Sequence, residues 1–212
     1  MNHPIYEKAK RGEWIDHSDR AKLVRTALKA KWPKVKFSVT SQTYSGGGTV
    51  RVRWFDGPTG KQVERIAGQF ETKGFDGSID LAHSRDLWLA PDGSASIAHD
   101  SGTQGSGGQH SEVIGSAHHP DAVLVSHICS GFVSCNRSLS VEMLQRCIDA
   151  VKAMNWGVLA DFPWHEIVIK TWNDGAAHLT GPAGHFQMPS GQWLDGYICL
   201  KASEFELQEA KA

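Results

Sequence analysis

Apolar and polar residues alternate along two stretches in the first third of the chain. Residues 35–40 (VKFSVT) place valine or phenylalanine at every second position, and residues 50–54 (VRVRW) do the same with valine and tryptophan. A period of two predicts β-strands, and two such strands joined by a glycine-bearing loop predict a β-hairpin. The three glycines at 46–48 precede a strand, whereas a phosphate-binding loop needs glycines ahead of a helix. They therefore predict a bend between two strands.

Two helical patterns flank this hairpin. Asp16 or Ser18 is suited to cap a helix that runs to about Lys31 with apolar side chains at helical spacing, and Pro33 stops it. Residues 59–70 carry a second apolar stripe, which opens with the capping-box spacing of Thr59 and Gln62. The two helices are expected to cover the apolar side of the hairpin. The fold class predicted for the chain is therefore α+β, an antiparallel sheet with helices packed on one face.

Further elements are predicted between residues 84 and 156. A small hairpin is expected about residues 91–93 (PDG), and the glycine-, serine- and histidine-rich segment 101–120 is expected to be a long mobile loop. The apolar run 123–135 predicts one or two buried strands. Ser140 is suited to cap a helix that ends near Trp156.

The last quarter of the chain has fewer regular patterns. Residues 167–172 and 197–201 look like strands, and the segment between them is rich in glycine and proline. The tail after residue 203 favours a short acidic helix. These patterns predict an irregular, β-rich C-terminal part.

The patterns divide the chain into three parts. Residues 1–16 are expected to be a loosely ordered lead-in, and residues 17–156 an α+β domain that contains the loop 101–120. Residues 157–212 are expected to form a β-rich C-terminal extension.

Composition narrows the functional classes. The chain of 212 residues has a formal net charge of −1, so nucleic acid or an anionic membrane would have to be bound through a local patch. No apolar run is long enough to span a bilayer, and the first residues lack the apolar centre of a signal peptide. We therefore expect a cytoplasmic protein, located in the host cell, without a membrane partner.

Cysteines and histidines are the candidates for catalytic or metal chemistry. Four cysteines in a cytoplasmic protein predict free thiols, and Cys129 and Cys135 lie in an apolar run where a thiol is usually inert. Among eleven histidines, His110, His118 and His119 are the candidate metal ligands. Their spacing matches no known ligand pattern, and we therefore expect no cofactor. A metal-dependent hydrolase or nuclease that uses the region 99–127 is kept as an alternative function.

Two sets of surface residues are candidates for binding. Lys36, Arg51 and Arg53 are predicted on the outer sheet face, and Tyr44 at the hairpin is suited to stack on a base, which together would suit a nucleic-acid-binding module. Trp172 and Trp193 lie in the irregular C-terminal part. Exposed aromatic residues there would suit a protein-binding surface or a homo-oligomer contact, whereas buried ones would form a second small core.

A longer run carries a family resemblance. The run PKVKFSVTSQTYSGGGTVRVRWFDGPTGKQVERIAGQF, followed by FDGSID at 75–80, resembles the large polyvalent protein-associated domain group, specifically its twenty-ninth numbered family. The matching features are the KFSV and VRVRW strands, the serine and glycine residues between them, the DGPT turn and the FDG-x-ID segment. A weaker similarity continues at FVSCNRSLS, residues 132–140.

The resemblance implies an origin in a phage, plasmid or conjugative element and an α+β fold, and it carries over no catalytic residue. Together with the absence of a complete catalytic motif, it favours a non-enzymatic accessory protein of a mobile genetic element. Such a protein would bind a host defence protein or a protein–nucleic-acid complex, with CRISPR or restriction systems as the expected targets.

Overall fold

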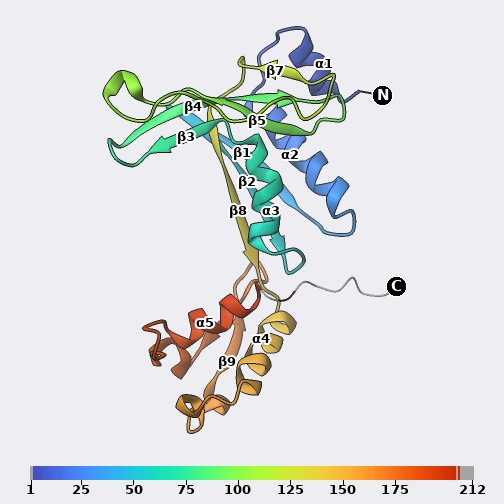
Figure 1. Cartoon of the computed structure of the whole chain (residues 1–212). Coiled ribbons are helices and arrows are strands. Elements are labelled where there is room, and N and C mark those ends of the chain that lie inside the picture. Colours follow the sequence, from blue (N-terminus) through green and yellow to red (C-terminus); the bar gives the residue numbers. More distant parts are fainter. Residues whose placement is uncertain (1, 204, 206–212) are drawn as a thin grey trace. The chain divides into compact units, whose positions relative to one another are not determined.

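The computed structural model describes residues 2–203 and residue 205, and it has an α+β fold with five α-helices and ten strands in this described part (Figure 1). The chain divides into two compact units. The first contains the residues up to 53 together with 61–136, and the second contains residues 54–60 together with those from 137 onward. None of the helices described is both long and apolar enough to cross a bilayer.

The predicted hairpin is confirmed in the first unit. Strands β1 (Ser38–Tyr44) and β2 (Gly47–Phe55) pair antiparallel, and β8 (Gly131–Ser138) completes a three-stranded sheet in the order β1-β2-β8. The register pairs Val39 with Val52, so that the alternating valines share the buried face. Trp54, which the alternation assigned to the core, is buried.

Helix α2 (His17–Lys31) packs on strand β1, as the helical spacing predicted. It begins at an N-cap aspartate, Asp16, whose side chain accepts a hydrogen bond from the backbone N–H of Asp19. Helix α3 (Gly60–Ala67) buries Val63 and Ala67 and is followed by the 3-10 turn η1 (Gly68–Phe70).

The first sixteen residues are more regular than expected. They include helix α1 (Pro4–Lys10), whose N-cap is the His3 side chain. Ile15 is fully buried and forms a parallel bridge with Ile128. The expectation of a loosely ordered lead-in missed these contacts because they involve partners more than a hundred residues away in sequence.

A second sheet completes the first unit. Its strands run in the order β3-β4-β5-β6, and β7 also pairs with β4. The predicted turn at residues 91–93 joins β4 to β5, and the apolar run 123–135 supplies β7 and the start of β8. The bounds of the five strands are β3 Lys73–Asp76, β4 Leu81–Leu89, β5 Ala95–Asp100, β6 Glu112–Val113 and β7 Val123–Val125.

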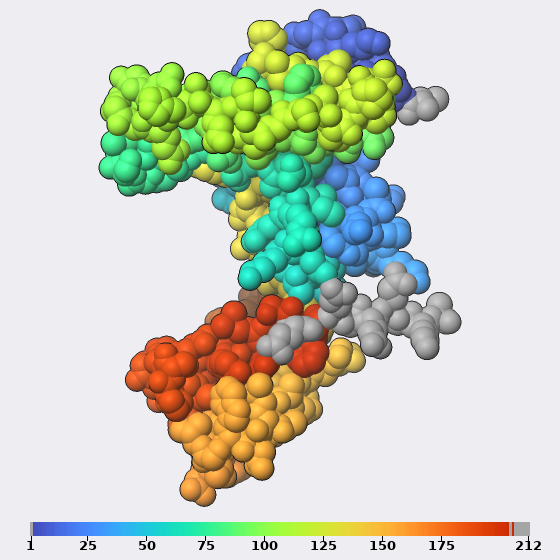
Figure 2. All heavy atoms as spheres, viewed as in Figure 1, coloured from blue at the N-terminus to red at the C-terminus, as the bar shows by residue number. Residues whose placement is uncertain are grey.

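The loop segment 101–120 has a defined anchor at Asp76. The buried carboxylate of Asp76 accepts hydrogen bonds from the hydroxyl groups of Ser78 and Thr103, both at 2.6 Å, and from the backbone N–H of Gln109 at 3.0 Å. The segment contains the 3-10 turn η2 (Gln104–Ser106), and the space-filling view shows it lying against the β3–β4 hairpin (Figure 2).

The second unit is organised around helix α4 (Val141–Ala153), which is capped by Ser140 as predicted. Strands β9 (Val168–Thr171) and β10 (Ala177–Thr180) form a hairpin beside it. Three 3-10 turns, η3 (Gly157–Leu159), η4 (Trp164–Glu166) and η5 (Pro182–His185), connect these elements. The prediction had grouped α4 with the preceding residues, whereas its apolar face packs with those that follow it.

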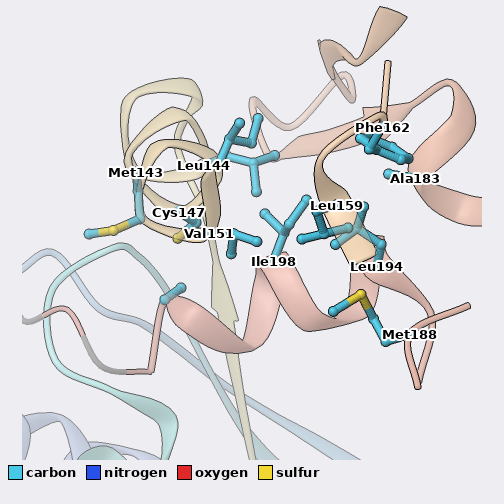
Figure 3. Packing of buried hydrophobic residues seen from close by; sticks show 12 residues of the cluster. Met143, Leu144, Cys147, Val151, Leu159, Phe162, Ala183, Met188, Leu194 and Ile198 are labelled. Atoms are coloured by element: carbon cyan, nitrogen blue, oxygen red, sulfur yellow. The ribbon is translucent and has the colours of Figure 1, made fainter. Parts of the chain in front are cut away.

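The predicted strand at residues 197–201 is wrong. These residues belong to helix α5 (Leu194–Lys201), which places Leu194 and Ile198 on one face, one helical turn apart. Both side chains point into a core shared with Cys147 and Val151 of α4 (Figure 3). A short apolar run does not by itself distinguish a strand from a helix, and here the partner helix decides the outcome. The acidic helix expected after residue 203 falls almost wholly outside the described residues.

Candidate functional site

A pocket of about 460 Å³ in the first unit is the candidate site, because a thiol and an imidazole lie together in its lining. It lies where the N-terminus of α2 meets the tip of the β1–β2 hairpin and the residues just before β8. Of the predicted site residues, only Tyr44 lines it. The pocket is lined by Trp14, Asp16, His17, Ser18, Ser41, Thr43, Tyr44, Gly47, Cys129 and Ser130.

Backbone pairing brings the floor of this pocket together. The N–H of Ile15 donates to the carbonyl of His127 at 3.0 Å, and the N–H of Cys129 donates to the carbonyl of Ile15 at 2.9 Å. These two hydrogen bonds place Cys129 beside His17, the first residue of helix α2. The Sγ of Cys129 lies 3.1 Å from the Nδ1 of His17, which is within hydrogen-bonding distance for a thiol.

A glycine makes room for the imidazole. Gly48 lies opposite Thr43 in the hairpin, and a Cβ atom at position 48 would lie 2.5 Å from the Nε2 of His17. Any side chain there would therefore displace the ring. The three glycines thus have different roles, because Gly46 has a positive φ of 87° at the turn whereas Gly48 provides space.

Arg20 supplies a buried positive charge next to the thiol and the imidazole. Its guanidinium is fully buried and donates hydrogen bonds to the carbonyls of Phe70 at 3.0 Å and Gly131 at 2.7 Å. One of its nitrogens, Nη1, lies 3.4 Å from the Nδ1 of His17 and 4.0 Å from the Sγ of Cys129. Since the two carbonyls hold the guanidinium, its charge is fixed in this position.

The surroundings keep both reactive groups neutral at rest. Burial lowers the pKa of His17, and the nearby charge of Arg20 lowers this pKa further, against the opposite effects of Asp16 and of a hydrogen bond to the Gly47 backbone. Burial raises the pKa of the Cys129 thiol, and Arg20 only partly opposes this. At neutral pH, a neutral imidazole therefore lies against a protonated thiol.

The predicted basic face is present, and it is separate from this pair of side chains. The register places Arg51 opposite Thr40 and Arg53 opposite Ser38, so both arginines share one exposed sheet face with Tyr44. Lys36 is exposed but precedes the first residue of β1. Within the described part of the chain, neither Arg51 nor Arg53 has an ion-pair or hydrogen-bond partner.

The two candidate tryptophans lie in the second unit and are exposed. Trp172 follows β9 and is 61% exposed, and its ring stacks on that of His178 with the centroids 4.0 Å apart. Trp193 is the N-cap residue of α5 and is 49% exposed. Trp164, in contrast, packs edge-on against Phe162 at the second unit's core.

The candidate metal ligands are not brought together. His118 lies within hydrogen-bonding distance of the hydroxyl groups of Ser94 and Ser96, His119 accepts a hydrogen bond from the N–H of Asp121, and His110 contacts Gln104. Residues 2–203 and 205 contain no group of three or more His, Cys, Asp or Glu side chains arranged to hold a metal ion. The geometry therefore gives no support to the metal-dependent alternative.

The sequence interpretation treated Cys129 as an inert buried thiol and did not select His17. Its other statement about the cysteines is confirmed, since all four are free thiols. Cys129 and His17 are 112 residues apart, and neither belongs to a recognisable catalytic motif. The sequence held no signal for the pair, because the two segments are brought together by tertiary contacts such as the bridge between Ile15 and Ile128.

Comparisons with known proteins identify a family. The sequence model of a family described as "Large polyvalent protein associated domain 29" matches residues 15–139, which is more than half of the chain. No curated protein matches this chain significantly. No solved structure does so either.

Proposed function

Since the chain belongs to the large polyvalent protein associated domain 29 family, we propose that it is an accessory protein of a phage or plasmid. It acts in the cytoplasm of the host cell by binding a host defence protein or a protein–nucleic-acid complex. The proposed targets are CRISPR or restriction systems. The single observation that carries the binding proposal is the exposed sheet face of Arg51, Arg53 and Tyr44, which we call the basic face.

The basic face has the chemistry for recognising anionic groups. A guanidinium without an internal partner is available for a bidentate hydrogen bond to a carboxylate or a phosphate. From Tyr44 to Arg53 the face extends over roughly 20 Å, at about 3.3 Å per strand residue. The formal net charge of −1 favours a local, specific contact over general attraction to nucleic acid.

Charge reversal tests this proposal in cells that carry a defined CRISPR or restriction system. Expression of the protein is expected to raise the plating efficiency of a targeted phage at least about tenfold, as a 1.4 kcal/mol change in an inhibitory equilibrium would do. The double variant Arg51→Glu, Arg53→Glu is expected to lose this effect.

The matched control reverses two exposed cations on α3, in the variant Lys61→Glu, Arg65→Glu. It has the same change in net charge and is expected to retain the effect. Loss in both variants, or protection at far below one molecule per target, would contradict a stoichiometric binding role for the basic face.

A second candidate function uses the same face to contact nucleic acid. It is favoured by Tyr44, whose exposed ring is suited to stack on a base beside the two arginines. Fluorescence anisotropy with a labelled oligonucleotide would separate the two functions. Nucleic-acid binding is expected to weaken steeply with salt, by roughly one power of the salt concentration for each phosphate group that the protein neutralises.

The exposed tryptophans are proposed as a second contact surface, for a protein partner or for another copy of this chain. The variants Trp172→Ala and Trp193→Ala are expected to weaken partner binding while leaving the fold intact, since both rings are largely exposed. Sedimentation of the isolated protein would show whether the partner is a second copy.

A further inference from the structure

We propose that the pocket at the N-terminus of α2 is an acyl-transfer site. In it Cys129 is the nucleophile, His17 is the general base, and the substrate is an amide carbonyl of an extended polypeptide. This activity goes beyond the binding function proposed above and does not use Arg51 or Arg53, whereas Tyr44 belongs to both the pocket and the basic face.

The geometry of the two side chains fits these roles. Nucleophilic catalysis by cysteine needs a base within hydrogen-bonding distance of the sulfur, and the Sγ of Cys129 lies 3.1 Å from the Nδ1 of His17. A general base must also be held in one orientation. Helix α2 fixes the His17 backbone, and the space left by Gly48 admits its ring.

Arg20 stabilises the charge that forms when the thiol loses its proton. A nearby cation favours the thiolate, and Nη1 of Arg20 lies 4.0 Å from the Sγ of Cys129. Because its other nitrogens are bound to the carbonyls of Phe70 and Gly131, the guanidinium needs no rearrangement as this charge develops. Arg20 is a positioning residue, since it acts through Cys129 and His17.

The walls of the pocket favour a polypeptide. Strand β1 is at the edge of its three-stranded sheet, and its residues Ser41 and Thr43 line the pocket. An edge strand offers backbone groups with which an extended chain can pair, and alternate side chains of that chain then enter neighbouring hollows. The exposed rings of Trp14 and Tyr44 provide apolar surface for such side chains.

The proposed reaction is hydrolysis in two steps, with water as the second reactant. In the first step, the Sγ of Cys129 bonds to the carbonyl carbon while its proton passes to the Nδ1 of His17. The C–N bond then breaks, and the leaving amine takes that proton, so that a thioester remains on Cys129. In the second step, water adds to the thioester carbon and gives a proton to His17. The C–S bond breaks, the sulfur recovers the proton, and a carboxylic acid leaves.

The acylation rate of Cys129 by p-nitrophenyl acetate tests the pair directly in the full-length protein, with mass spectrometry to locate the acetyl group. At pH 7 we expect Cys129 to react at least about tenfold faster than Cys199, although Cys199 is the exposed cysteine and Cys129 is buried. The variant His17→Gln is expected to slow the acylation of Cys129 by about 100-fold, the usual size of a general-base contribution. Equal rates for Cys129 and the buried Cys147, or no effect of His17→Gln, would overturn the proposal.

The pH dependence of the wild-type protein provides a readout that needs no variant. Its acylation rate should rise as His17 loses its proton, at a pH below the usual imidazole range, and then stay level until the thiol itself ionises. The groups that face His17 are Asp16, the N-cap of α2, Arg20 within α2, Cys129 and the Gly47 backbone. Glu71 and Tyr44 act on Arg20. A rate that climbs tenfold per pH unit throughout, as for an isolated thiol, would overturn the role of His17.

Vinyl sulfones test the substrate class. A library of tetrapeptide vinyl sulfones is expected to label Cys129 at least about tenfold faster than phenyl vinyl sulfone, which carries no peptide; this ratio corresponds to about 1.4 kcal/mol of recognition. Equal labelling by the two would overturn the assignment to polypeptides. The variant Arg51→Glu, Arg53→Glu is expected to label normally, so failure of the basic face and failure of the thiol site are distinguishable.

Discussion

A single carboxylate, that of Asp76, holds the segment after β5 in place. It ends strand β3, is buried, and accepts hydrogen bonds from Ser78, Thr103 and Gln109. The hydrogen bond from Ser78 contributes most to lowering the pKa of Asp76, which lies well below its usual range, and those from Thr103 and Gln109 lower this pKa further. The FDG-x-ID motif therefore stabilises a contact across the loop as well as its own turn.

The variant Asp76→Asn tests this anchor through its pH dependence. Because the folded-state pKa is depressed, the carboxylate stabilises the fold above its unfolded-state pKa near 4, and this contribution is lost as the pH falls towards the folded-state value. We therefore expect Asp76→Asn to lower the free energy of unfolding in urea above pH 5. The difference from wild type should narrow as the pH falls below 4.

Asp80→Asn is the matched control, since Asp80 is exposed in the same turn and its positive φ of 54° is tolerated by asparagine. It is expected to change the free energy of unfolding by less than about 0.5 kcal/mol. A pH-independent effect of Asp76→Asn would show that the ionised carboxylate is not the stabilising group.

At the scale of elements, local patterns predicted those helices and strands that carry an alternation or a cap better than those that carry only an apolar run. The β1–β2 hairpin, α2 and α4 each had a local signal, which was an alternation for the hairpin, a cap at Asp16 or Ser18 for α2 and a cap at Ser140 for α4. All three elements are confirmed, and Asp16 is the cap of α2. The residues YICLK at 197–201 had only an apolar run. These residues form a helix because they pack against α4, and a short apolar run in the sequence does not reveal this tertiary contact.

The candidate site depended still more on tertiary structure. The sequence predicted that Arg51 and Arg53 share a face, because alternation along one strand is a local property. It did not predict the pair of His17 and Cys129, which requires pairing between residues 15 and 128. Patterns within one element can thus locate a surface, whereas a site built from distant segments needs the fold.

Helix α5 gives a prediction at the element scale. Ile198 is fully buried in the core shared with α4, whereas Leu200 on the same helix is 56% exposed. Ile198→Ala is expected to reduce the free energy of unfolding by about 3 kcal/mol because it leaves a cavity, and Leu200→Ala by less than about 0.5 kcal/mol. Urea denaturation followed by circular dichroism measures both, and similar losses would contradict the helical assignment of this face.

At the scale of the whole molecule, the family match includes residues from both units. It covers 15–139, and the second unit begins at Arg137 and also contains the short segment 54–60. The DGPT turn and Arg137 of the FVSCNRSLS run, which carried part of the resemblance, meet inside this second unit. The guanidinium of Arg137 donates hydrogen bonds to the carbonyls of Asp56, Gly57 and Ala202, at 2.9, 3.2 and 2.6 Å.

Arg137 therefore joins three segments that are distant in sequence. The carboxylate of Asp56 also accepts a hydrogen bond from the backbone N–H of Ser140, the N-cap residue of α4. Arg137 is half-buried and also donates to the carbonyl of Phe205, so its loss would remove a donor from four carbonyls. The DGPT turn and Arg137 thus have a structural role, because their hydrogen bonds hold the separate segments of the second unit together.

The variant Arg137→Ala tests this closure. It is expected to reduce the free energy of unfolding of the second unit by about 2 kcal/mol, the usual cost of removing a charged group that donates several hydrogen bonds. Hydrogen exchange should accelerate at α5 and in segment 54–60, with the amides of the β3–β5 sheet unchanged. Lys170→Ala, at an exposed position on β9, is the control and is expected to leave all of these rates unaltered. Because Arg137 satisfies carbonyls on separate segments, exchange that accelerates at only one of them would contradict its role as their common donor.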